Sequence, residues 1–331
     1  MIVSIILVGK NEGFHLKRTL QSAYNLIDLY KEIDFEVIYV DSKSTDNSIE
    51  IAKSFPLTRI FEITGVTNSA IARNIGAKEA KGEILFFVDA DMEIHPYFLR
   101  HALNEDGELK NEYITGHLDD YFYTKENEFI SSEPRTYKNK IPKDIQELNH
   151  NGGLCLINKS AWADIGGMRN KYRRSQDLDL TIRLKKKGIK ILRLPCLAAK
   201  HHTIDYRNEK RMWKTLWQGN SLYPGLLFRD HFFNITVLQR VVRSDYTALL
   251  LFCSLIALLI DMRLFLILIT SYLFLLSMRA FYQTLKAKSK KSKALYFFER
   301  IPYQILTDLS FWFGFLCFFP GNHETEYKSI N

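Results

Sequence analysis

The sequence Ile84-Leu85-Phe86-Phe87-Val88-Asp89-Ala90-Asp91 places two aspartates, one residue apart, directly after five apolar residues. A short apolar run of this kind predicts a buried β-strand. If the backbone stays extended, the carboxylates of Asp89 and Asp91 point to the same side, because side chains alternate along a strand. Carboxylate oxygens suit Mg²⁺ or Mn²⁺, which commonly complete their coordination with a diphosphate. The octapeptide therefore predicts a metal-assisted diphosphate site at the end of a buried strand.

Strand-like runs and helical patterns alternate before this point. Strands are predicted over residues 2–8, 36–40, 57–63 and 84–88, and helices over 16–27, 49–55 and 68–80. Residues 105–151 are more polar, and a strand pattern resumes at 152–158. The alternation is typical of an α/β fold with a mostly parallel sheet that helices cover on both faces. Ligands of such sheets bind beyond the carboxyl ends of the strands, which directs attention to Asn11–Glu12, Asp41 and Asp89–Asp91.

The turn after the first strand excludes two common nucleotide sites. It reads Gly9-Lys10-Asn11-Glu12-Gly13, which is neither GxGxxG nor GxxxxGK[ST], so dinucleotide and P-loop sites are not predicted. A single carboxylate near a strand end is more often a helix cap or a loop residue. The chain has four such groups, however, and together they favour a binding site: Glu12, Asp41 with Asp46, Asp89 with Asp91, and Asp177 with Asp179.

The composition is that of a globular protein. Of 331 residues, 47% are hydrophobic and 25% are charged, which excludes a disordered or low-complexity chain. The four cysteines are far apart in sequence and form no CxxC pair, so neither a disulfide scaffold nor a zinc ribbon is expected. The first residues, MIVSIILVGKNEG, lack a basic segment and a cleavage site, so we expect no secretory signal.

The carboxyl-terminal part predicts contact with a membrane. Residues 246–260 and 264–278 are uncharged, and Asp261-Met262-Arg263 separates them. We interpret them as a hairpin of membrane helices over about residues 244–282, with packed core helices as the alternative. A third apolar segment, 301–319, spans the membrane or lies in its interface. These patterns divide the chain into an α/β domain, residues 1–240, and a membrane-associated region, residues 241–331.

The net charge of +8 has an uneven distribution. Between Arg279 and Arg300 there are seven basic residues and one acid, Glu299. A polybasic segment beside an apolar stretch indicates a cytoplasmic membrane flank before it indicates a nucleic-acid surface. We therefore expect both ends of the hairpin on the cytoplasmic side, membrane lipids as partners, and no nucleic-acid partner.

Five segments form an ordered set along the chain. They are SIILVGKNE (Ser4–Glu12), VIYVDSKSTDNS (Val37–Ser48), ARNIGAKEAKGEILFFVDAD (Ala72–Asp91), NGGLCLINKSAWADIGGM (Asn151–Met168) and SQDLDLTIRLKKKG (Ser175–Gly188). As a set they resemble the GT-A catalytic domain of glycosyltransferase family 2, including its A-R-N-x-G helix, its DxD strand and its E-D-x-D-L helix. The resemblance covers roughly residues 1–230. It implies the GT-A fold of nucleotide-diphospho-sugar transferases followed by C-terminal membrane helices.

The resemblance also implies roles for individual residues. It implies that Asp41 contacts the nucleobase, that Glu12 and Arg73 lie beside the nucleotide, and that Asp89 contacts the ribose. It also implies that Asp91 binds the metal and that Asp177 is the general base. A histidine after the base helix can complete the shell of Mn²⁺ or Mg²⁺. Of the adjacent His201 and His202 we select His201, with a surface histidine pair as an equal alternative. An inverting transfer fits this set, because one carboxylate takes the acceptor proton while the metal neutralises charge on the leaving diphosphate.

Two departures from the family pattern affect this interpretation. Gln176 stands where the family usually has Glu, so a like charge next to Asp177 is missing. With a helix N-terminus and two arginines nearby, we expect Asp177 to be ionised at neutral pH. The Q-x-x-R-W motif of processive synthases is also missing, since the nearest segment reads Trp217-Gln218-Gly219-Asn220. Repeated addition to a growing polymer is therefore disfavoured.

The function expected from the sequence is the inverting transfer of a single sugar from a nucleotide-diphosphate sugar to a lipid-linked or membrane-bound glycan acceptor. The protein is expected at the plasma or inner membrane, with its catalytic domain on the cytoplasmic face. A polyprenyl-phosphate monosaccharide synthase is a close alternative. A sugar nucleotidyltransferase would need a Gly-rich, Arg-containing loop that residues 9–13 do not supply. A non-catalytic nucleotide-sugar-binding membrane protein is a third alternative, which Gln176 supports.

Overall fold

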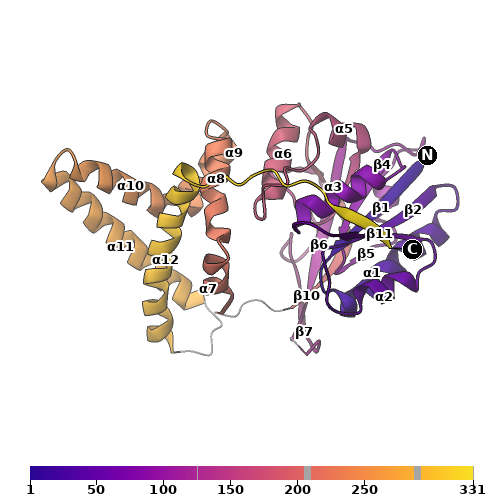
Figure 1. The fold of residues 1–331 in the computed structure, drawn as a ribbon, viewed down its shortest axis with the longest axis horizontal. Coiled ribbons are helices and arrows are strands. Elements are labelled where there is room, and N and C mark those ends of the chain that lie inside the picture. The colour runs from indigo at the N-terminus through magenta and orange to yellow at the C-terminus, as the bar shows by residue number, and fades with distance from the viewer. Residues whose placement is uncertain (125, 205–209, 287–291, 331) are drawn as a thin grey trace. The chain divides into compact units, whose positions relative to one another are not determined.

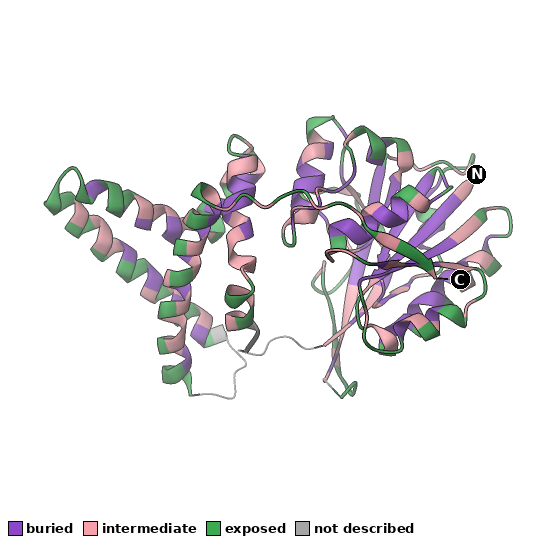
Figure 2. Ribbon diagram, viewed as in Figure 1, coloured by how far each residue is buried: buried purple, intermediate pink, exposed green. Residues whose placement is uncertain are grey.

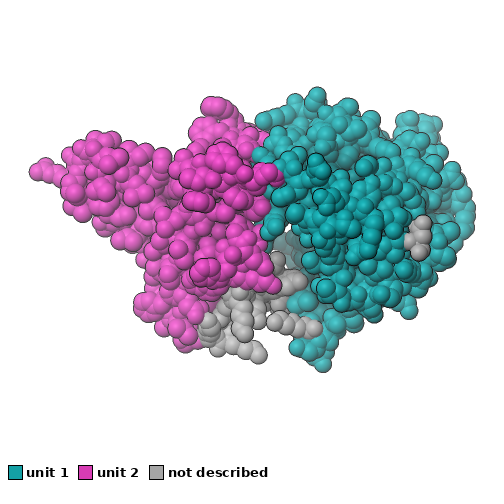
Figure 3. Space-filling view, viewed as in Figure 1, with its two compact units in different colours: residues 1–205, 322–331 teal, residues 206–321 magenta. Residues whose placement is uncertain are grey.

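The computed structural model describes residues 1–124, 126–204, 210–286 and 292–330. The chain forms two compact units, residues 1–205 with 322–331 and residues 206–321, shown in different colours in Figure 3. We had placed the boundary at residue 240. It lies earlier because helix α8 (Tyr223–Asp230) packs closely on α12 (Lys293–Leu316) within the second unit. A Cβ atom at Gly225 would lie only 1.8 Å from the backbone oxygen of Phe311.

An 11-stranded mixed sheet forms the centre of the first unit (Figure 1). The strand order in the described residues is β11-β3-β2-β1-β4-β9-β6-β10-β5, where β11 is Tyr327–Ile330. Strand β7 (Phe129–Pro134) lies beside β6, and β8 (Gln146–Glu147) lies beside β10. Four adjacent strands are parallel: β3 (Thr58–Ile63), β2 (Asp34–Asp41), β1 (Ile2–Gly9) and β4 (Ile84–Asp89). Farther along, β6 (Tyr113–Tyr123) and β10 (Leu192–Ile204) are parallel, whereas β9 (Cys155–Asn158) and β5 (Met92–Ile94) run antiparallel to their neighbours. The predicted α/β fold with flanking helices is confirmed.

Helices cover both faces of the parallel strands because these strands are apolar on both sides. In β1, Ile5 and Leu7 face one core, and Ile6 and Val8 face the other. Helices α1 (Gly13–Leu29), α2 (Ser48–Lys53) and α4 (Phe98–Ala102) cover the first core, and α3 (Ser69–Glu79), α5 (Lys159–Asp164) and α6 (Gln176–Lys186) cover the second. Figure 2 shows the resulting row of buried strands. A continuous apolar run is the sequence pattern of such a strand.

Two interior strands, β6 and β10, were not predicted. The sequence distinguishes residues 105–151 only as more polar, but β6 crosses the sheet there and is buried from Tyr113 to Leu118. Asp119 and Asp120 interrupt its apolar pattern, and both have partners on neighbouring segments. The strand predicted over 152–158 begins only at Cys155.

The last residues of the chain return to the first unit. Strand β11 (Tyr327–Ile330) pairs antiparallel with the edge strand β3. The Tyr327 hydroxyl donates to a carboxylate oxygen of Glu79 at 2.6 Å, and the side-chain amide of Asn170 donates to the backbone oxygen of His323 at 2.7 Å. A strand added at an edge satisfies backbone groups that would otherwise be unpaired. We had assigned this segment to the membrane-associated region.

The second unit is helical over its described residues. It contains α7 (Lys210–Trp217), a 3-10 helix (Asn220–Leu222), α8, α9 (Ile235–Ser244), α10 (Tyr246–Leu258), α11 (Met262–Lys286) and α12. Helices α10 and α11 pair as a hairpin whose turn contains Asp261, which accepts hydrogen bonds from the backbone of Arg263 and Leu264. The third apolar segment falls largely within α12. Of the polybasic run, residues 287–291 lie outside the described residues.

Helix α11 is the one helix of the described ranges that is long and apolar enough to cross a membrane by itself, over Met262–Leu285. Helices α9 and α10 reach that criterion only as a pair, and the pair is bent by 84°. Many apolar side chains of α11 are exposed, among them Ile267 (63%), Phe274 (63%) and Leu285 (61%) (Figure 2). The second unit therefore has a large exposed apolar surface.

Candidate active site

Asp89 and Asp91 lie where β4 ends and the chain turns before β5. Two backbone hydrogen bonds fix the turn. The nitrogen of Ala90 donates to the backbone oxygen of Val8 at 2.9 Å, and the backbone nitrogen of His202 donates to the backbone oxygen of Asp91 at 2.8 Å. The two carboxylates have different partners, since Asp89 faces Arg73 and Asp91 faces His201. Both nevertheless line the same cavity.

This cavity has a volume of about 340 Å³ and lies at the carboxyl ends of β1 and β4. Gly9 and Glu12 line it on one side, and Asn68 and Ser69 line it at the N-terminus of α3. Asn68 caps α3, because its side-chain oxygen accepts from the backbone nitrogen of Ile71 at 2.8 Å. The free backbone N–H groups and the dipole of a helix N-terminus favour an anion such as a phosphate. The cavity therefore offers acids for a cation next to donors for an anion.

Arg73 connects the end of β4 with the loop before β9. Its Nη2 atom lies 2.6 Å from Oδ1 of Asp89 and donates to the backbone oxygen of Gly153 at 3.3 Å. Its Nη1 atom is buried and has no hydrogen-bond partner among the described residues. Burial opposes the charge of Arg73, but the carboxylates of Asp89 and Asp177 outweigh burial and raise its pKa. Arg73 is therefore a fixed cation between two acids.

Glu12 is the third acid at the cavity. Its backbone nitrogen donates to the Ser48 hydroxyl at 3.1 Å, which fixes the turn after β1. Burial, together with the carboxylates of Asp91 and Asp89, raises the pKa of Glu12 to about 8. Three acids so close repel one another, and a divalent cation would relieve that repulsion.

His201 lies on β10 between two carboxylates. Its Nε2 atom is 3.1 Å from Oδ2 of Asp91, and its Nδ1 atom is 2.8 Å from Oδ1 of Asp120 on β6. Burial disfavours the imidazolium, but the hydrogen bonds with Asp120 and Asp91 outweigh it and raise the pKa of His201 to about 9.

The atoms around Asp91 fit a divalent cation. Oδ1 of Asp91 is buried without a hydrogen-bond partner in the described part of the chain, and Nε2 of His201 converges on the other oxygen. A cation there would take the place of the Nε2 proton. Among the described residues, no group of three or more His, Cys, Asp or Glu side chains could hold a metal. A metal would therefore have few protein ligands and would need a diphosphate or water to complete its shell.

His202 has a different environment from His201. Its Nδ1 atom lies 3.0 Å from a guanidinium nitrogen of Arg18 and 2.9 Å from the Tyr123 hydroxyl, and its Nε2 atom lies 3.2 Å from a carboxylate oxygen of Glu93. Both ring nitrogens are thus occupied by protein partners. Of the two histidines, His201 is the one placed beside Asp91.

Asp41 is fully buried at the end of β2. One carboxylate oxygen accepts from the Tyr39 hydroxyl at 2.8 Å, and the other accepts from the backbone nitrogen of Ser44 at 2.7 Å. Its neighbour Ser42 lines the cavity, whereas Asp41 is not among the lining residues. In this arrangement Asp41 orders the loop that follows β2.

Asp177 lies in the first turn of α6, directly after a tight bend. Ser175 has φ 65°, in the left-handed region that favours glycine. Desolvation raises the pKa of Asp177, and Asp89 adds to this shift while Arg73 opposes it. Desolvation thus shifts the pKa of Asp177 in the direction opposite to the one expected from a helix N-terminus, and its ionisation at neutral pH stays a prediction.

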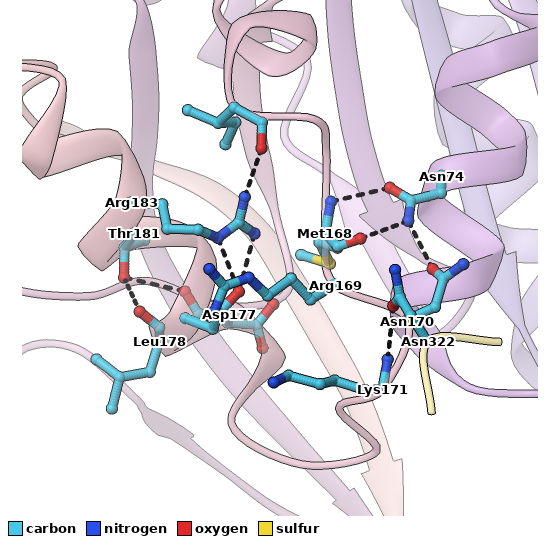
Figure 4. A network of polar contacts seen from close by, with 12 residues as sticks. Asn74, Met168, Arg169, Asn170, Lys171, Asp177, Leu178, Thr181, Arg183 and Asn322 are labelled. Carbon is cyan, nitrogen blue, oxygen red and sulfur yellow. Dashed lines mark hydrogen bonds and ion pairs between the residues drawn. The ribbon is translucent and has the colours of Figure 1, made fainter. Parts of the chain in front are cut away.

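Helix α6 is anchored by a polar network (Figure 4). Asp179 is fully buried and forms ion pairs with Arg169 at 3.2 Å and Arg183 at 2.9 Å. Asn74 of α3 accepts from the backbone nitrogen of Met168 and donates to its oxygen, at 2.9 and 2.7 Å. These contacts fix the loop before α6 and hence the position of Asp177.

Two residues near the cavity were not predicted. Asp120 contacts His201, and Arg135 contacts Asp120 through its Nε atom at 2.8 and 3.0 Å from the two carboxylate oxygens. The signal that could have found Asp120 is the pair Asp119-Asp120 within the aromatic run ending in Tyr121-Phe122-Tyr123.

Comparisons with known proteins identify the family and the fold of the first unit. Residues 4–166 match the model of the family described as glycosyl transferase family 2. The chain is 32% identical over 118 residues to the poly(ribitol-phosphate) beta-N-acetylglucosaminyltransferase TarP of Staphylococcus aureus, a match that spans 34% of this chain and only 36% of TarP. It is 25% identical over 295 residues to a dolichyl N-acetyl-alpha-D-glucosaminyl phosphate 3-beta-D-2,3-diacetamido-2,3-dideoxy-beta-D-glucuronosyltransferase of Methanococcus voltae, spanning 78% of this chain and 86% of the relative.

A solved structure shows the same fold. The structure of residues 1–349 of S. aureus TarS in complex with UDP-GlcNAc is 13% identical, with a TM-score of 0.53 over 93% of this chain and 91% of that fragment. The fold and the site define a GT-A domain. Residues 4–166 of the chain are a glycosyltransferase family 2 domain.

Proposed function

We propose that this protein is a metal-dependent, inverting glycosyltransferase that moves one sugar from a nucleotide-diphosphate sugar to a lipid-linked or membrane-bound glycan acceptor. The observation that carries the proposal is the ion pair between Arg73 and Asp89, 2.6 Å apart, at a cavity that Asp89 and Asp91 both line. The carboxylate of Asp177 also helps to raise the pKa of Arg73. The names of the relatives add support, because TarP is a poly(ribitol-phosphate) glycosyltransferase and the M. voltae relative is a transferase named for a dolichyl-linked sugar phosphate.

The cavity is the proposed donor site. Asp91 and His201 would hold Mn²⁺ or Mg²⁺, which when bound neutralises negative charge on the leaving diphosphate. The N-terminus of α3 would bind a phosphate through its backbone N–H groups. Glu12 and Arg73 would lie beside the nucleotide and Asp89 beside the ribose. Asp41 would shape the nucleobase end of the site through the loop that contains Ser42.

Asp177 is the proposed general base. It would accept the proton of the acceptor hydroxyl as that oxygen forms a bond to the anomeric carbon, while the bond from this carbon to the diphosphate breaks. A single displacement inverts the configuration at that carbon. A base is most effective when its pKa lies near the working pH, and the raised pKa of Asp177 is a shift in that direction.

Helix α11 is the proposed membrane contact. Its exposed apolar side chains fit a lipid environment, and the basic residues between Arg279 and Arg300 would lie near anionic lipid headgroups. By the distribution of these charges, the catalytic unit would work on the cytoplasmic face, where nucleotide sugars are the donors and the acceptor is presented by the membrane.

The proposal can be tested with full-length protein in detergent. A panel of nucleotide sugars is incubated with a membrane extract and MnCl₂, products are identified by mass, and NMR gives the anomeric configuration. We expect transfer with inversion that EDTA abolishes, and loss of transfer without unfolding in Asp91→Ala. Asp106→Ala, at an exposed position away from the cavity, is the control. Normal turnover of Asp91→Ala with a divalent ion still required would show that the metal assignment is wrong, and donor binding without any turnover would favour the non-catalytic alternative.

A further inference from the structure

Asp120 and His201 are direct neighbours in the sheet. Strands β6 and β10 are parallel there, and their register pairs Asp120 with His201. Oδ1 of Asp120 is 2.8 Å from Nδ1 of His201, and Oδ2 of Asp91 is 3.1 Å from Nε2 of the same ring. Each ring nitrogen thus faces one carboxylate, one from strand β6 and the other from the turn between β4 and β5.

Arg135 fixes Asp120 by contacting both of its carboxylate oxygens. Its Nε atom is 2.8 and 3.0 Å from the two carboxylate oxygens, and a second guanidinium nitrogen is 2.5 Å from Oδ1. Arg135 itself is anchored, because its backbone nitrogen donates to Leu118 at 2.9 Å. An Arg–carboxylate pair of this kind has a defined geometry. The oxygen of Asp120 therefore stays directed at Nδ1.

The two neighbours of Nδ1 favour opposite tautomers of a neutral imidazole. With a proton on Nδ1, the ring donates to Asp120, and the lone pair of Nε2 points to the position beside Asp91. With the proton on Nε2, the ring could accept from Arg135, which also contacts Nδ1, but no lone pair would then face Asp91. A histidine binds a metal through the nitrogen that carries no proton. Only the first tautomer is competent to bind a cation next to Asp91.

We propose that Asp120, held by Arg135, is a positioning residue that keeps the proton of His201 on Nδ1 and so determines the affinity of the site for a divalent cation. The inference rests on the proposed metal dependence. A carboxylate that orients a metal-binding histidine in this way typically accounts for about 10–100-fold in metal affinity. Loss of Asp120 would leave Arg135 to favour the other tautomer.

His202 shows what the alternative looks like in the same strand. Its Nδ1 atom faces the guanidinium of Arg18, which can only donate, so a neutral His202 carries its proton on Nε2 and donates it to Glu93. The carboxylate of Asp120 thus favours the proton on Nδ1 of His201, whereas the guanidinium of Arg18 favours the proton on Nε2 of His202.

Manganese binding tests this inference without any turnover. Full-length protein in detergent is titrated with MnCl₂, and free Mn²⁺ is measured by electron paramagnetic resonance. We expect Asp120→Asn to raise Kd by about 10–100-fold. The matched control is Asp119→Asn, which makes the same charge change one residue away, where the carboxylate accepts from the Tyr137 hydroxyl at 2.7 Å. The control should bind Mn²⁺ like the wild type.

A second measurement uses the wild-type ring and does not depend on the folding of a variant. In ¹⁵N-histidine-labelled protein saturated with Mg²⁺, with His201 assigned from His201→Asn, we expect Nδ1 to carry the proton. A proton on Nε2, or equal Mn²⁺ affinity of Asp120→Asn and wild type, would overturn the inference while metal dependence stood. A wild-type protein that binds no Mn²⁺ would instead overturn the metal dependence itself, and the inference with it.

Discussion

Gly152 faces Asp177 so closely that a Cβ atom at residue 152 would lie 2.8 Å from Oδ2 of the carboxylate. Gly152 precedes β9 and Asp177 lies in the first turn of α6, so the contact joins two segments that are distant in the sequence. The carboxylate occupies the space that the missing side chain leaves. The position of the proposed base therefore depends on the absence of a side chain in a neighbouring loop.

We expect Gly152→Ala to lower kcat while the protein stays folded. The carboxylate is the end of a flexible side chain and can move away from the new methyl group at little cost in stability. A displaced base loses its geometry, and an ångström of misplacement can cost about 100-fold in rate. Transfer kinetics and thermal unfolding measure the two effects. Gly321→Ala is the control, because no atom lies within 4 Å of its Cβ position. Unchanged kcat in Gly152→Ala would contradict the role of Asp177.

Asp177→Asn and Asp179→Asn should fail for different reasons. Asparagine at 177 keeps the shape but not the basicity, so we expect unchanged donor affinity and a transfer rate lower by about 10²–10⁴-fold. Asparagine at 179 leaves Arg169 and Arg183 facing a neutral buried group, which costs about 3–5 kcal/mol of stability for a broken buried pair. Chemical denaturation and single-turnover kinetics separate the two. A stable but inactive Asp179→Asn together with an active Asp177→Asn would show that the base is misassigned.

The metal-free protein should lose stability as Glu12 ionises. The pKa of Glu12 is raised from 4.5 to about 8 by burial and by Asp91 and Asp89. The folded state thus favours the protonated carboxyl of Glu12. Its contribution to the free energy of unfolding is complete below pH 4.5 and is lost as pH rises through about 8. We expect Glu12→Gln to melt at a higher temperature than wild type at pH 8.5 and at a similar temperature at pH 5. Mn²⁺ should reduce the difference, and a difference that is larger at pH 5 would refute the assignment.

Removal of residues 322–331 should destabilise the first unit. The deletion exposes the edge of β3 and removes the hydrogen bond between Asn170 and His323. We expect a lower melting temperature than in Tyr327→Phe, which loses only the hydrogen bond to Glu79, worth about 1 kcal/mol.

The same strand changes the design of a soluble fragment. The sequence alone predicts that residues 1–240 form a stable domain, but this fragment lacks β11. Residues 1–205 joined by a flexible linker to 322–331 should be more resistant to proteolysis than residues 1–240. Equal resistance of the two fragments would show that β11 contributes little.

Charged substitutions on α11 should release the protein from membranes. Ile267→Glu and Phe274→Glu each place a carboxylate on an exposed apolar surface. An acidic side chain at the centre of a membrane helix raises the free energy of membrane insertion by about 2.5–3.5 kcal/mol. We expect the double variant to float less with liposomes than wild type. Leu57→Glu, at a comparably exposed position of the first unit, should float normally. A wild-type protein that stays in solution without detergent and does not float would contradict the membrane assignment.

The parallel half of the sheet and the placement of Asp89 and Asp91 could be predicted because local patterns determine them. A strand buried on both faces is apolar throughout, and the residues that follow it lie at the carboxyl end of the sheet, where ligands bind. Asp120 could not be predicted in this way, because its role depends on the register between β6 and β10. The pKa shift of Asp177 was also out of reach, since it reflects desolvation by segments distant in sequence. Strand β11 is polar and short, and it forms only because β3 offers a free edge.

The pairing of β11 with β3 has a consequence for the order of synthesis. Strands β1 to β10 all leave the ribosome before the helices of residues 206–321, and β11 leaves after them. Until the last ten residues appear, β3 remains an open edge, and the sheet is one strand short. A chain that stops within the helices therefore yields a catalytic unit with an exposed edge, which is prone to association or degradation. The sheet is completed only in molecules that have already made every helix of the second unit.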